Sequence, residues 1–283
     1  MKKITVVIPA LNEEKTIGKV LREIPVSTLR DMGYETQILV IDNGSRDKTA
    51  NVARHYGANV IVQPVRGYGN AYKAGFANAT GDIIATGDAD LTYPFEDLPK
   101  LIAIMETEEL DFISTNRLEH VNPEAMTPSH VFGNKVLTTL TRVLFDFPFG
   151  DSQSGMWIFR RSVWEALHVH SAGMSFSEEL KIEAAIRGFR CAEIPINYRA
   201  RVGESKLNSF KDGTKVAFEI FHKRLSTLFL KKKGKRKEKI FAHIGECRVQ
   251  GKEFQPEGVG SLHPFPNIIP EDEVREEKQV GDC

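Results

Sequence analysis

The first 115 residues alternate between short apolar runs and segments whose apolar residues recur at helical spacing. The apolar runs that predict β-strands cover residues 4–9, 37–42, 59–64, 82–87 and 111–115. Two of the intervening segments place apolar residues three and four apart: Ile17, Val20, Leu21 and Ile24, and then Leu98, Leu101, Ile102 and Met105. Strands that alternate with helices form a parallel sheet covered by helices. The sequence therefore predicts an α/β fold with a mostly parallel central sheet.

Polar residues follow each of the five predicted strands. They are Pro9 to Glu13, Asp42 to Asp47, Arg66 to Asn70, Asp88 to Pro94, and Arg117. Right-handed crossovers bring the carboxyl ends of parallel strands to one edge, where ligands of open α/β sheets bind. We therefore expect a ligand site at this edge. Residues 10–16 contain no glycine that would let a pyrophosphate approach the backbone, which argues against a dinucleotide cofactor.

The fourth strand delivers Asp88 and Asp90, one residue apart, onto the turn beyond it. Side chains at i and i+2 leave an extended chain on the same side, so both carboxylates can face one hard cation. Magnesium held by one or two carboxylates keeps coordination positions open for substrate phosphates. Alternatively, acidic residues after a strand cap the next helix or form a turn.

Composition excludes several classes of protein. The 283 residues are 41% hydrophobic and 27% charged, which predicts a folded chain with one large core. The formal net charge of +0 gives no field that favours nucleic acid. We expect a cytosolic chain, because no run reaches the roughly eighteen apolar residues of a membrane span and the start does not read as a signal peptide. Cys191, Cys247 and Cys283 are scattered and predict reduced thiols without a zinc site.

Several motifs resemble a known family when they are taken in order. The runs VVIPALNEEKTIGKVL, VIDNGSRDKT, VRGYGNAYKAGF and GDADLTYP resemble the nucleotide-sugar domain of family 2 glycosyltransferases, which have the GT-A fold. Further on, STNRL, GNKVLTTLTRVLF, DSQSGMWIFRRSVWEAL and RVGESKLN are similar to dolichyl-phosphate sugar synthases. The resemblance covers residues 3–225. It implies transfer of a sugar from a nucleotide-diphosphate sugar to a polyprenyl (dolichyl) phosphate.

The resemblance also implies roles for the donor side of the site. The residues that would hold the nucleoside and diphosphate are Pro9, Leu11, Glu13, Asp42, Asp88, Ala89, Asp90, Arg201 and Lys206. Asp88 and Asp90 would bind Mg²⁺ or Mn²⁺, with Thr92 as a weaker oxygen ligand where related enzymes often have glutamine. Asp42 and Asn43 stand where relatives often have two aspartates, which leaves the base contact open. The A-L-N-E and R-G-Y-G variants favour UDP-glucose or UDP-N-acetylglucosamine as donor.

A phosphate acceptor requires a cation rather than a general base, because its oxygen is already a nucleophile. The resemblance makes Arg117 the acceptor-phosphate residue and, with Asp90, the catalytic pair, and a guanidinium grips phosphate oxygens in a bidentate manner. His130 is a second candidate, although a solvated surface position explains it equally well. Asp151 is expected to shape the site, and Glu178 with Glu179 to begin a helix.

The C-terminal part divides into an amphipathic segment and an extension. Residues 212–230 carry an apolar stripe of Ala217, Phe218, Phe221, Leu225, Leu228 and Phe229, with Lys215, Glu219, His222 and Lys223 opposite. KKKGKRK follows at 231–237, and the two together predict docking on an anionic membrane surface at its cytoplasmic face. The alternative is a helix packed on its own domain. We expect a catalytic domain at 1–211, with nucleotide-sugar and acceptor halves at 1–116 and 117–211, and an extension of unassigned role at 238–283.

Three functional hypotheses remain open at this point. The first is a metal-dependent, peripheral membrane synthase of lipid-phosphate-linked hexose or N-acetylhexosamine, used in protein glycosylation or glycan assembly. The second is a transferase with a soluble phosphorylated acceptor, such as a phosphoglycerate. The third is a non-catalytic nucleotide-sugar binding subunit, which would be expected to lack Asp88, Asp90 or Arg117, yet all three are present.

Overall fold

The computed structural model describes residues 1–145, 147–203, 213–214, 216–221, 223–224 and 241–242. All of them belong to one compact unit, Met1–Gly245. Lys206, the basic run at 231–237 and most of the extension at 238–283 lie outside the described residues. Among the helices within the described ranges, none is both long enough and apolar enough to cross a bilayer.

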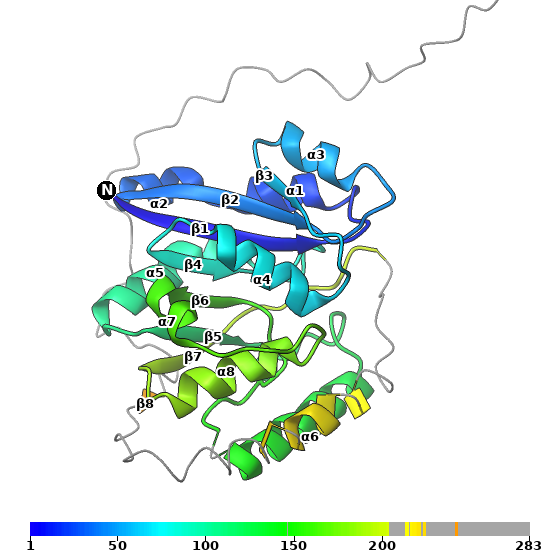
Figure 1. The fold of residues 1–283 in the computed structure, drawn as a ribbon, viewed down its shortest axis with the longest axis vertical. Helices are drawn as coiled ribbons and strands as arrows, with labels where there is room; N and C mark the ends of the chain where they lie inside the picture. The colour runs from blue at the N-terminus through cyan, green and yellow to red at the C-terminus, as the bar shows by residue number, and fades with distance from the viewer. Residues whose placement is uncertain (146, 204–212, 215, 222, 225–240, 243–283) are drawn as a thin grey trace, which may run out of the picture. The chain divides into compact units, whose positions relative to one another are not determined.

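Within the part of the chain that the structure describes, eight strands form one sheet in the order β3-β2-β1-β4-β6-β5-β7-β8 (Figure 1). The strands are β1 (Lys2–Ala10), β2 (Tyr34–Asp42), β3 (Asn59–Val62), β4 (Ile83–Thr86), β5 (Phe112–Asn116), β6 (Trp157–Arg160), β7 (Cys191–Pro195) and β8 (Phe241–Ala242). The helices are α1 (Ile17–Glu23), α2 (Val26–Asp31), α3 (Thr49–His55), α4 (Tyr68–Asn78), η1 (Phe95–Asp97), α5 (Leu98–Thr107), α6 (Pro128–Phe145), α7 (Arg161–Ala166) and α8 (Phe176–Ile186).

The sheet is parallel except at β6, which runs antiparallel to both of its neighbours, β4 and β5. The predicted fold class is therefore confirmed, and each of the five predicted strands is present with shifted ends. The antiparallel strand was not predicted. Its four residues, WIFR, follow helix α6 and the DSQSG motif and lead directly into α7. In the sequence this stretch had been assigned to a motif and not to a strand.

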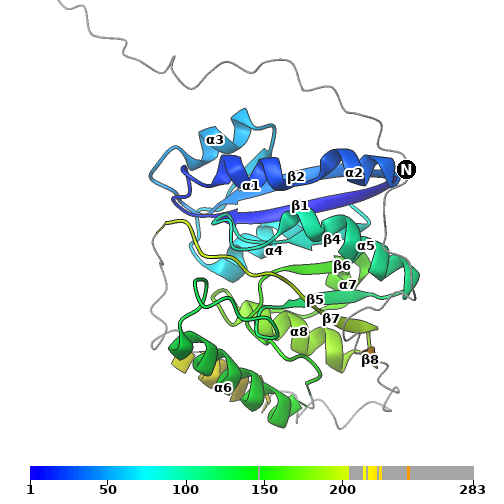
Figure 2. The same ribbon diagram turned by 180° about the vertical axis from the view of Figure 1, so that it is seen from behind.

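Two cores lie on opposite faces of the sheet, as the alternation of side chains along β1 shows. Ile4, Val6 and Ile8 pack with α1, α2, α3 and α5, whereas Val7 packs with α4, α7 and α8 on the other face. The views from the two sides show these helix layers in turn (Figures 1 and 2). The predicted covering of the sheet by helices on both faces is confirmed.

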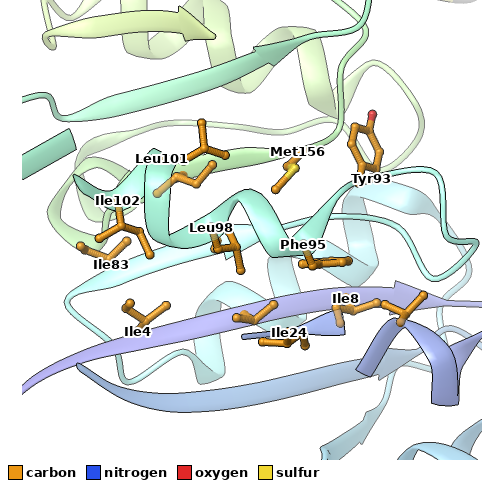
Figure 3. Close-up of a cluster of buried hydrophobic side chains, with 14 of the residues drawn as sticks. Ile4, Ile8, Ile24, Ile83, Tyr93, Phe95, Leu98, Leu101, Ile102 and Met156 are labelled. Atoms are coloured by element: carbon orange, nitrogen blue, oxygen red, sulfur yellow. The ribbon is translucent and has the colours of Figure 1, made fainter. Parts of the chain in front are cut away.

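Helix α5 illustrates how sequence spacing determines packing. Leu98, Leu101, Ile102 and Met105 are all buried in the first core. Figure 3 shows the first three in one cluster with Ile4, Ile83 and Met156. The predicted apolar face of α1 is buried as well, through Ile17, Val20 and Leu21. Both helices therefore pack in the first core against residues of β1, β2 and β4, the strands that lead into three of the polar clusters.

The predicted amphipathic segment is helical at residues 213–214, 216–221 and 223–224. Val216 and Ile220 are buried in the second core. On the same side, Lys223 pairs with Glu179 at 2.9 Å and with Glu183 at 2.7 Å, and Glu219 accepts a hydrogen bond from Ser175. Phe218 and Phe221 are exposed. The segment thus packs on its own domain through one side and presents Phe218 and Phe221 of the predicted apolar stripe outward. Leu225, Leu228 and Phe229 of that stripe lie outside the described residues.

Candidate active site

The loops after β1, β4, β5 and β7 bring five charged residues into one cluster: Glu13, Asp88, Asp90, Arg117 and Arg201. Burial, followed by the neighbouring Asp90 carboxylate, raises the pKa of Asp88 to about 7. The guanidinium groups of Arg201 and Arg117 act in the opposite direction on the same carboxyl. The carboxyl edge of the sheet therefore contains two acidic side chains with two cations close enough to influence them, as the sequence predicted.

The turn after β4 holds Asp90 rigidly. Asp90 is buried, and its Oδ1 accepts hydrogen bonds from Thr92 N at 3.1 Å and Thr92 Oγ1 at 2.6 Å. Leu91 has a φ of +68°, which is unusual for a residue with a Cβ and shows that the turn is constrained. The Thr92 hydroxyl therefore orients the Asp90 carboxylate through a hydrogen bond. In this arrangement it supports a metal ligand instead of serving as a separate oxygen ligand.

The donor set fits a hard cation that is bound together with substrate phosphates. The described residues contain no cluster of three or more His, Cys, Asp or Glu side chains arranged for a metal. Asp88 and Asp90 supply two carboxylates, and Mg²⁺ commonly binds one or two carboxylates and completes its shell with phosphate and water. A zinc-type site, which needs four protein ligands or three plus water, does not fit this pair.

Arg117 is paired with Asp151 in the interior. The Asp151 carboxylate accepts hydrogen bonds from Arg117 N at 3.1 Å, Nε at 2.7 Å and Nη2 at 2.9 Å, and the guanidinium lies 5.3 Å from the centre of the Tyr198 ring. Burial disfavours the charged guanidinium, but the Asp151 carboxylate outweighs it and keeps the pKa of Arg117 above its ordinary value. Asp151 is thus more than a turn carboxylate, because it fixes the direction of Arg117.

The loop that carries Asp151 is itself clamped by two further buried charges. Glu193 of β7 accepts hydrogen bonds from Gly150 N at 2.7 Å, Asp151 N at 2.9 Å and Asn116 Nδ2 at 2.9 Å. From the other side, Lys181 Nζ donates to the carbonyl oxygens of Asp151 at 2.8 Å and Ser152 at 3.0 Å. We missed Glu193 and Lys181 in the sequence. The signal in the sequence was Glu193 inside the apolar run CAEIPI, and Lys181 together with Glu183 inside LKIEAA.

Asp42 and Asn43 have different roles at the end of β2. Asp42 is buried and accepts a hydrogen bond from Ser45 N at 2.9 Å. Asn43 Nδ2 donates to the carbonyl oxygens of Gln63 and Val65, while its Oδ1 accepts from Gly67 N at 2.8 Å. A carboxylate at position 43 has no donor for the two carbonyl groups. The departure from two aspartates therefore reflects a structural amide that holds the R-G-Y-G loop.

The glycines of R-G-Y-G permit contact with a distant loop. Gly67 has a φ of +143°, and a Cβ there would lie 2.3 Å from the carbonyl oxygen of Ala172. A Cβ on Gly69 would lie 2.4 Å from the carbonyl oxygen of Ser171. Gly69 N donates to Ala172 O at 2.9 Å. These glycines join the donor half to the loop before α8, a function distinct from the phosphate contact that glycine-rich loops often make.

Arg201 reaches back from the segment after β7 onto the β4 turn. Its Nη2 lies 2.8 Å from Asp90 Oδ2, and Val202 N donates to Asp90 O at 3.2 Å. Arg199 fastens the same segment through ion pairs with Glu23 and Glu96. The two oxygens of Asp90 are thus engaged by Thr92 and by Arg201. The predicted position of Arg201 beside the acidic pair is present in the structure.

The remaining predicted residues differ in burial and in hydrogen bonding. Pro9 and Leu11 are half-buried at the end of β1, and Ala89 is buried between the two aspartates. Glu13 Oε2 accepts a hydrogen bond from Thr16 at 2.9 Å. His130 is exposed in the first turn of α6.

Glu178 and Glu179 begin α8, as predicted, and both have structural partners. Glu179 Oε2 accepts hydrogen bonds from the backbone of His170 and Ser171. Glu178 Oε1 accepts from Ser152 Oγ at 2.8 Å and Thr141 Oγ1 at 3.3 Å, while Oε2 is buried without a hydrogen-bond partner. Burial raises the pKa of Glu178 to about 8. Near neutral pH this carboxyl is therefore largely protonated in the folded chain.

The protonation of Glu178 predicts a measurable pH dependence of stability. Between about pH 5 and about pH 8 the folded chain keeps a proton that the unfolded chain releases, so this group lowers the free energy of unfolding by roughly 1 kcal/mol per pH unit as pH rises. We expect Glu178→Gln to remove this slope in urea unfolding. Glu165→Gln, whose side chain is 63% exposed, should leave the slope unchanged. Parallel curves for Glu178→Gln and wild type would contradict the assignment.

Comparison with known proteins agrees with the site. The model of the family "Glycosyl transferase family 2" matches residues 5–167. The chain is 34% identical over 217 residues to dolichyl-phosphate hexose transferase of Haloferax volcanii, covering 77% of this chain and 92% of that one. It is 39% identical over 212 residues to low-salt glycan biosynthesis hexosyltransferase Agl6 of the same organism, covering 74% of this chain but only 51% of that protein.

Solved structures give the same fold. Glucosyl-3-phosphoglycerate synthase from Mycobacterium tuberculosis, in complex with Mn²⁺, UDP and phosphoglyceric acid, superposes with a TM-score of 0.60 at 25% identity, covering 80% of this chain and 78% of that one. The same synthase with Mg²⁺ and UDP gives a TM-score of 0.59 at 26% identity, covering 80% of this chain and 79% of that one. With a GT-A sheet, an acidic pair at its carboxyl edge and a family match over more than half its length, the chain belongs to glycosyltransferase family 2.

Proposed function

We propose that this glycosyltransferase moves a hexose or N-acetylhexosamine from a nucleotide-diphosphate sugar, with a UDP-sugar favoured, to a polyprenyl (dolichyl) phosphate. The observation that carries the proposal is the cluster in which Asp88 lies beside Asp90 and within the electrostatic reach of Arg117 and Arg201. A carboxylate pair suits a metal-bound diphosphate, and a fixed guanidinium suits a second phosphate. The named dolichyl-phosphate relative supports the acceptor, and the UDP-bound neighbour supports the donor.

On the donor side, the buried Asp42 at the end of β2 is the proposed partner of the base, with Pro9, Leu11 and Glu13 lining the nucleoside. Asp88 and Asp90 would hold Mg²⁺ or Mn²⁺, and Ala89 lies between them. The ion would act as a Lewis acid for the charge that develops on the departing diphosphate. Arg201, which lies 2.8 Å from Asp90, would neutralise the same diphosphate from the other side, and Lys206 is proposed to assist it. Thr92 supports Asp90 and is a weaker candidate for the metal.

On the acceptor side, the reaction needs orientation more than proton transfer. An oxygen of the acceptor phosphate forms a bond to C1 of the sugar, and the bond from C1 to the diphosphate oxygen breaks, with its electron pair leaving on the nucleoside diphosphate. No proton has to move, because the attacking oxygen is already ionised. Arg117 would position the phosphate through guanidinium donors other than the two that bind Asp151. His130 is the second proposed phosphate contact.

The acceptor also demands access to a membrane surface. We propose that residues 212–237 dock on the cytoplasmic face, in keeping with a peripheral protein. The packing of the described part supports this, because Val216 and Ile220 attach the helix to its own domain and leave Phe218 and Phe221 exposed. An amphipathic helix next to a basic run provides the two signals that stable peripheral binding requires.

A second candidate function is transfer to a soluble phosphorylated acceptor. The structural neighbour that superposes on 80% of this chain is named a glucosyl-3-phosphoglycerate synthase. The same cluster of two carboxylates and two guanidinium groups would serve a phosphoglycerate as well as a lipid phosphate. The two functions differ in one respect that can be measured, namely whether turnover requires a lipid acceptor.

A panel of radiolabelled UDP- and GDP-sugars tests the proposal. Each sugar is incubated with Mg²⁺ or Mn²⁺ and with dolichyl phosphate, 3-phosphoglycerate or no acceptor, and the products are separated between organic and aqueous phases. We expect label from one UDP-sugar to enter the organic phase only when dolichyl phosphate is present. Label that enters an acidic aqueous product with 3-phosphoglycerate instead would replace the proposed function by the second candidate.

A further inference from the structure

Helix α6 has apolar side chains on two sides. On the inward side Phe145 lies in the second core, and Leu137, Leu140 and Leu144 pack against that core. Thr138 and Thr141 are buried and hydrogen-bonded to Ser152 and Glu178. Phe132 is 71% exposed and Val143 is 77% exposed. A helix that serves only its own domain turns its apolar face inward. The outward face of α6 therefore fits an apolar partner.

The exposed residues form one continuous stripe. Phe132, Val136, Thr139 and Val143 are spaced by four, three and four residues, which places them on the same side of a helix. The stripe extends about 16 Å along the axis, because a helix rises about 1.5 Å per residue. Lys135 and Arg142 are exposed along one flank, and the eighteen residues of α6 contain no aspartate or glutamate. The face is therefore both apolar and cationic.

The helix that bears this face adjoins the segment already proposed to reach the membrane. The guanidinium of Arg224 lies 5.9 Å from the centre of the Phe145 ring, so the end of the described C-terminal helix contacts the end of α6. Phe218 and Phe221 are exposed on that helix, and the chain continues in sequence toward KKKGKRK. Two adjoining helices thus expose aromatic side chains near cations.

We infer that the outward face of α6 docks on a bilayer that contains anionic lipid. Phe132, Val136 and Val143 would lie at the boundary between headgroups and acyl chains, and Lys135 and Arg142 among the anionic headgroups, as in other interfacial helices. The positive charge of this face favours an anionic bilayer over a second copy of the chain. In a two-fold dimer the same cationic face would meet itself. The acidic run EDEVREE of the extension could neutralise the cations, but it offers a single valine to an apolar stripe.

The inference rests on the proposed function only in that the acceptor is a membrane lipid, and docking can be measured without any substrate. In sedimentation assays, the full chain is expected to bind phosphatidylcholine vesicles that contain a quarter phosphatidylglycerol, and to bind pure phosphatidylcholine much less. Val136→Asp/Val143→Asp should bind the mixed vesicles on the order of tenfold more weakly. Lys135→Gln/Arg142→Gln should weaken binding to the mixed vesicles only, with a smaller dependence on salt.

Val62→Asp is the matched control. This valine is 57% exposed on β3, at the opposite edge of the sheet from β7 and β8, and its replacement should leave vesicle binding unchanged. All variants should turn over a short-chain, water-soluble polyprenyl phosphate at the wild-type rate, because delivery of that acceptor needs no bilayer. Equal vesicle binding by wild type and Val136→Asp/Val143→Asp would overturn the docking surface. Normal vesicle binding without transfer to any polyprenyl phosphate would instead refute the proposed function and leave the docking surface standing.

A fluorescent probe identifies the occupant directly. An environment-sensitive fluorophore on Val143→Cys, with Cys247 and Cys283 replaced by serine, should emit as in water and shift to the blue when mixed vesicles are added. Cys191 is buried and is not expected to compete for the label. A probe that is already blue-shifted without vesicles would show that the extension or a second copy covers the face. Light scattering of the same sample would then tell these two occupants apart, and either result overturns membrane docking.

Discussion

Replacing Asp151 by alanine is expected to lower the free energy of unfolding by about 3–5 kcal/mol, because it leaves the buried Arg117 guanidinium without its counter-ion. Asp151 is fully buried and accepts three hydrogen bonds from Arg117. The same change should abolish most transfer activity, since the cation would no longer be held in one direction. Urea unfolding and turnover of the best donor measure the two effects separately.

Two comparisons separate the fold from the chemistry. Glu165→Ala breaks an exposed pair with Arg161 and should change stability by no more than about 0.5 kcal/mol. The double variant Arg117→Met/Asp151→Leu replaces both charges by apolar groups and should recover much of the lost stability, but not the activity. If the double variant regained turnover, Arg117 would have no role in binding the acceptor. A loss below about 1 kcal/mol in Asp151→Ala would show that the pair does not hold this loop.

The sequence predicted the features that depend on neighbouring residues. The faces of α1 and α5 follow from apolar residues three and four apart, and the burial of Leu98, Leu101 and Ile102 agrees with that spacing. Asp88 and Arg117 lie close together because the carboxyl ends of parallel strands share one edge of the sheet. Both residues follow within two positions of a strand's end. In both cases the prediction needs only a local sequence pattern and one general rule, either the period of the helix or the handedness of the crossover.

The features that escaped prediction depend on partners far away in the chain. Lys181 contacts Asp151 across 30 residues, and Glu193 contacts it across 42. No periodicity encodes such contacts, so the only trace of each was a charged residue within a largely apolar run. Asn43 is a similar case, because its departure from the family pattern left the base contact open. The structure explains it by two backbone carbonyl groups that only an amide can satisfy.

The C-terminal helix shows a third limit, which is the choice between two apolar faces. The stripe that includes Phe218 and Phe221 was clear from spacing, but Val216 and Ile220 form a second and smaller apolar side. Spacing alone does not say which side meets the domain. The ion pairs of Lys223 with Glu179 and Glu183 decide it, because they attach the smaller side to α8.

Asp90→Asn is expected to reduce the turnover rate by about a thousandfold or more, because several kcal/mol of metal-derived stabilisation of the leaving diphosphate would be lost. Asparagine keeps the shape of the side chain and an oxygen for the Thr92 hydrogen bond, but it removes the charge that a hard cation requires. Asp82→Asn is the matched control, since Asp82 is an exposed aspartate that directly precedes β4, at the opposite end of the strand from Asp90. Wild-type activity should disappear in excess EDTA and return when Mg²⁺ or Mn²⁺ is added, whereas Asp90→Asn should stay inactive at every metal concentration. Full turnover of the wild-type enzyme in excess EDTA would remove the metal from the mechanism and leave Arg201 and Arg117 to neutralise the diphosphate alone.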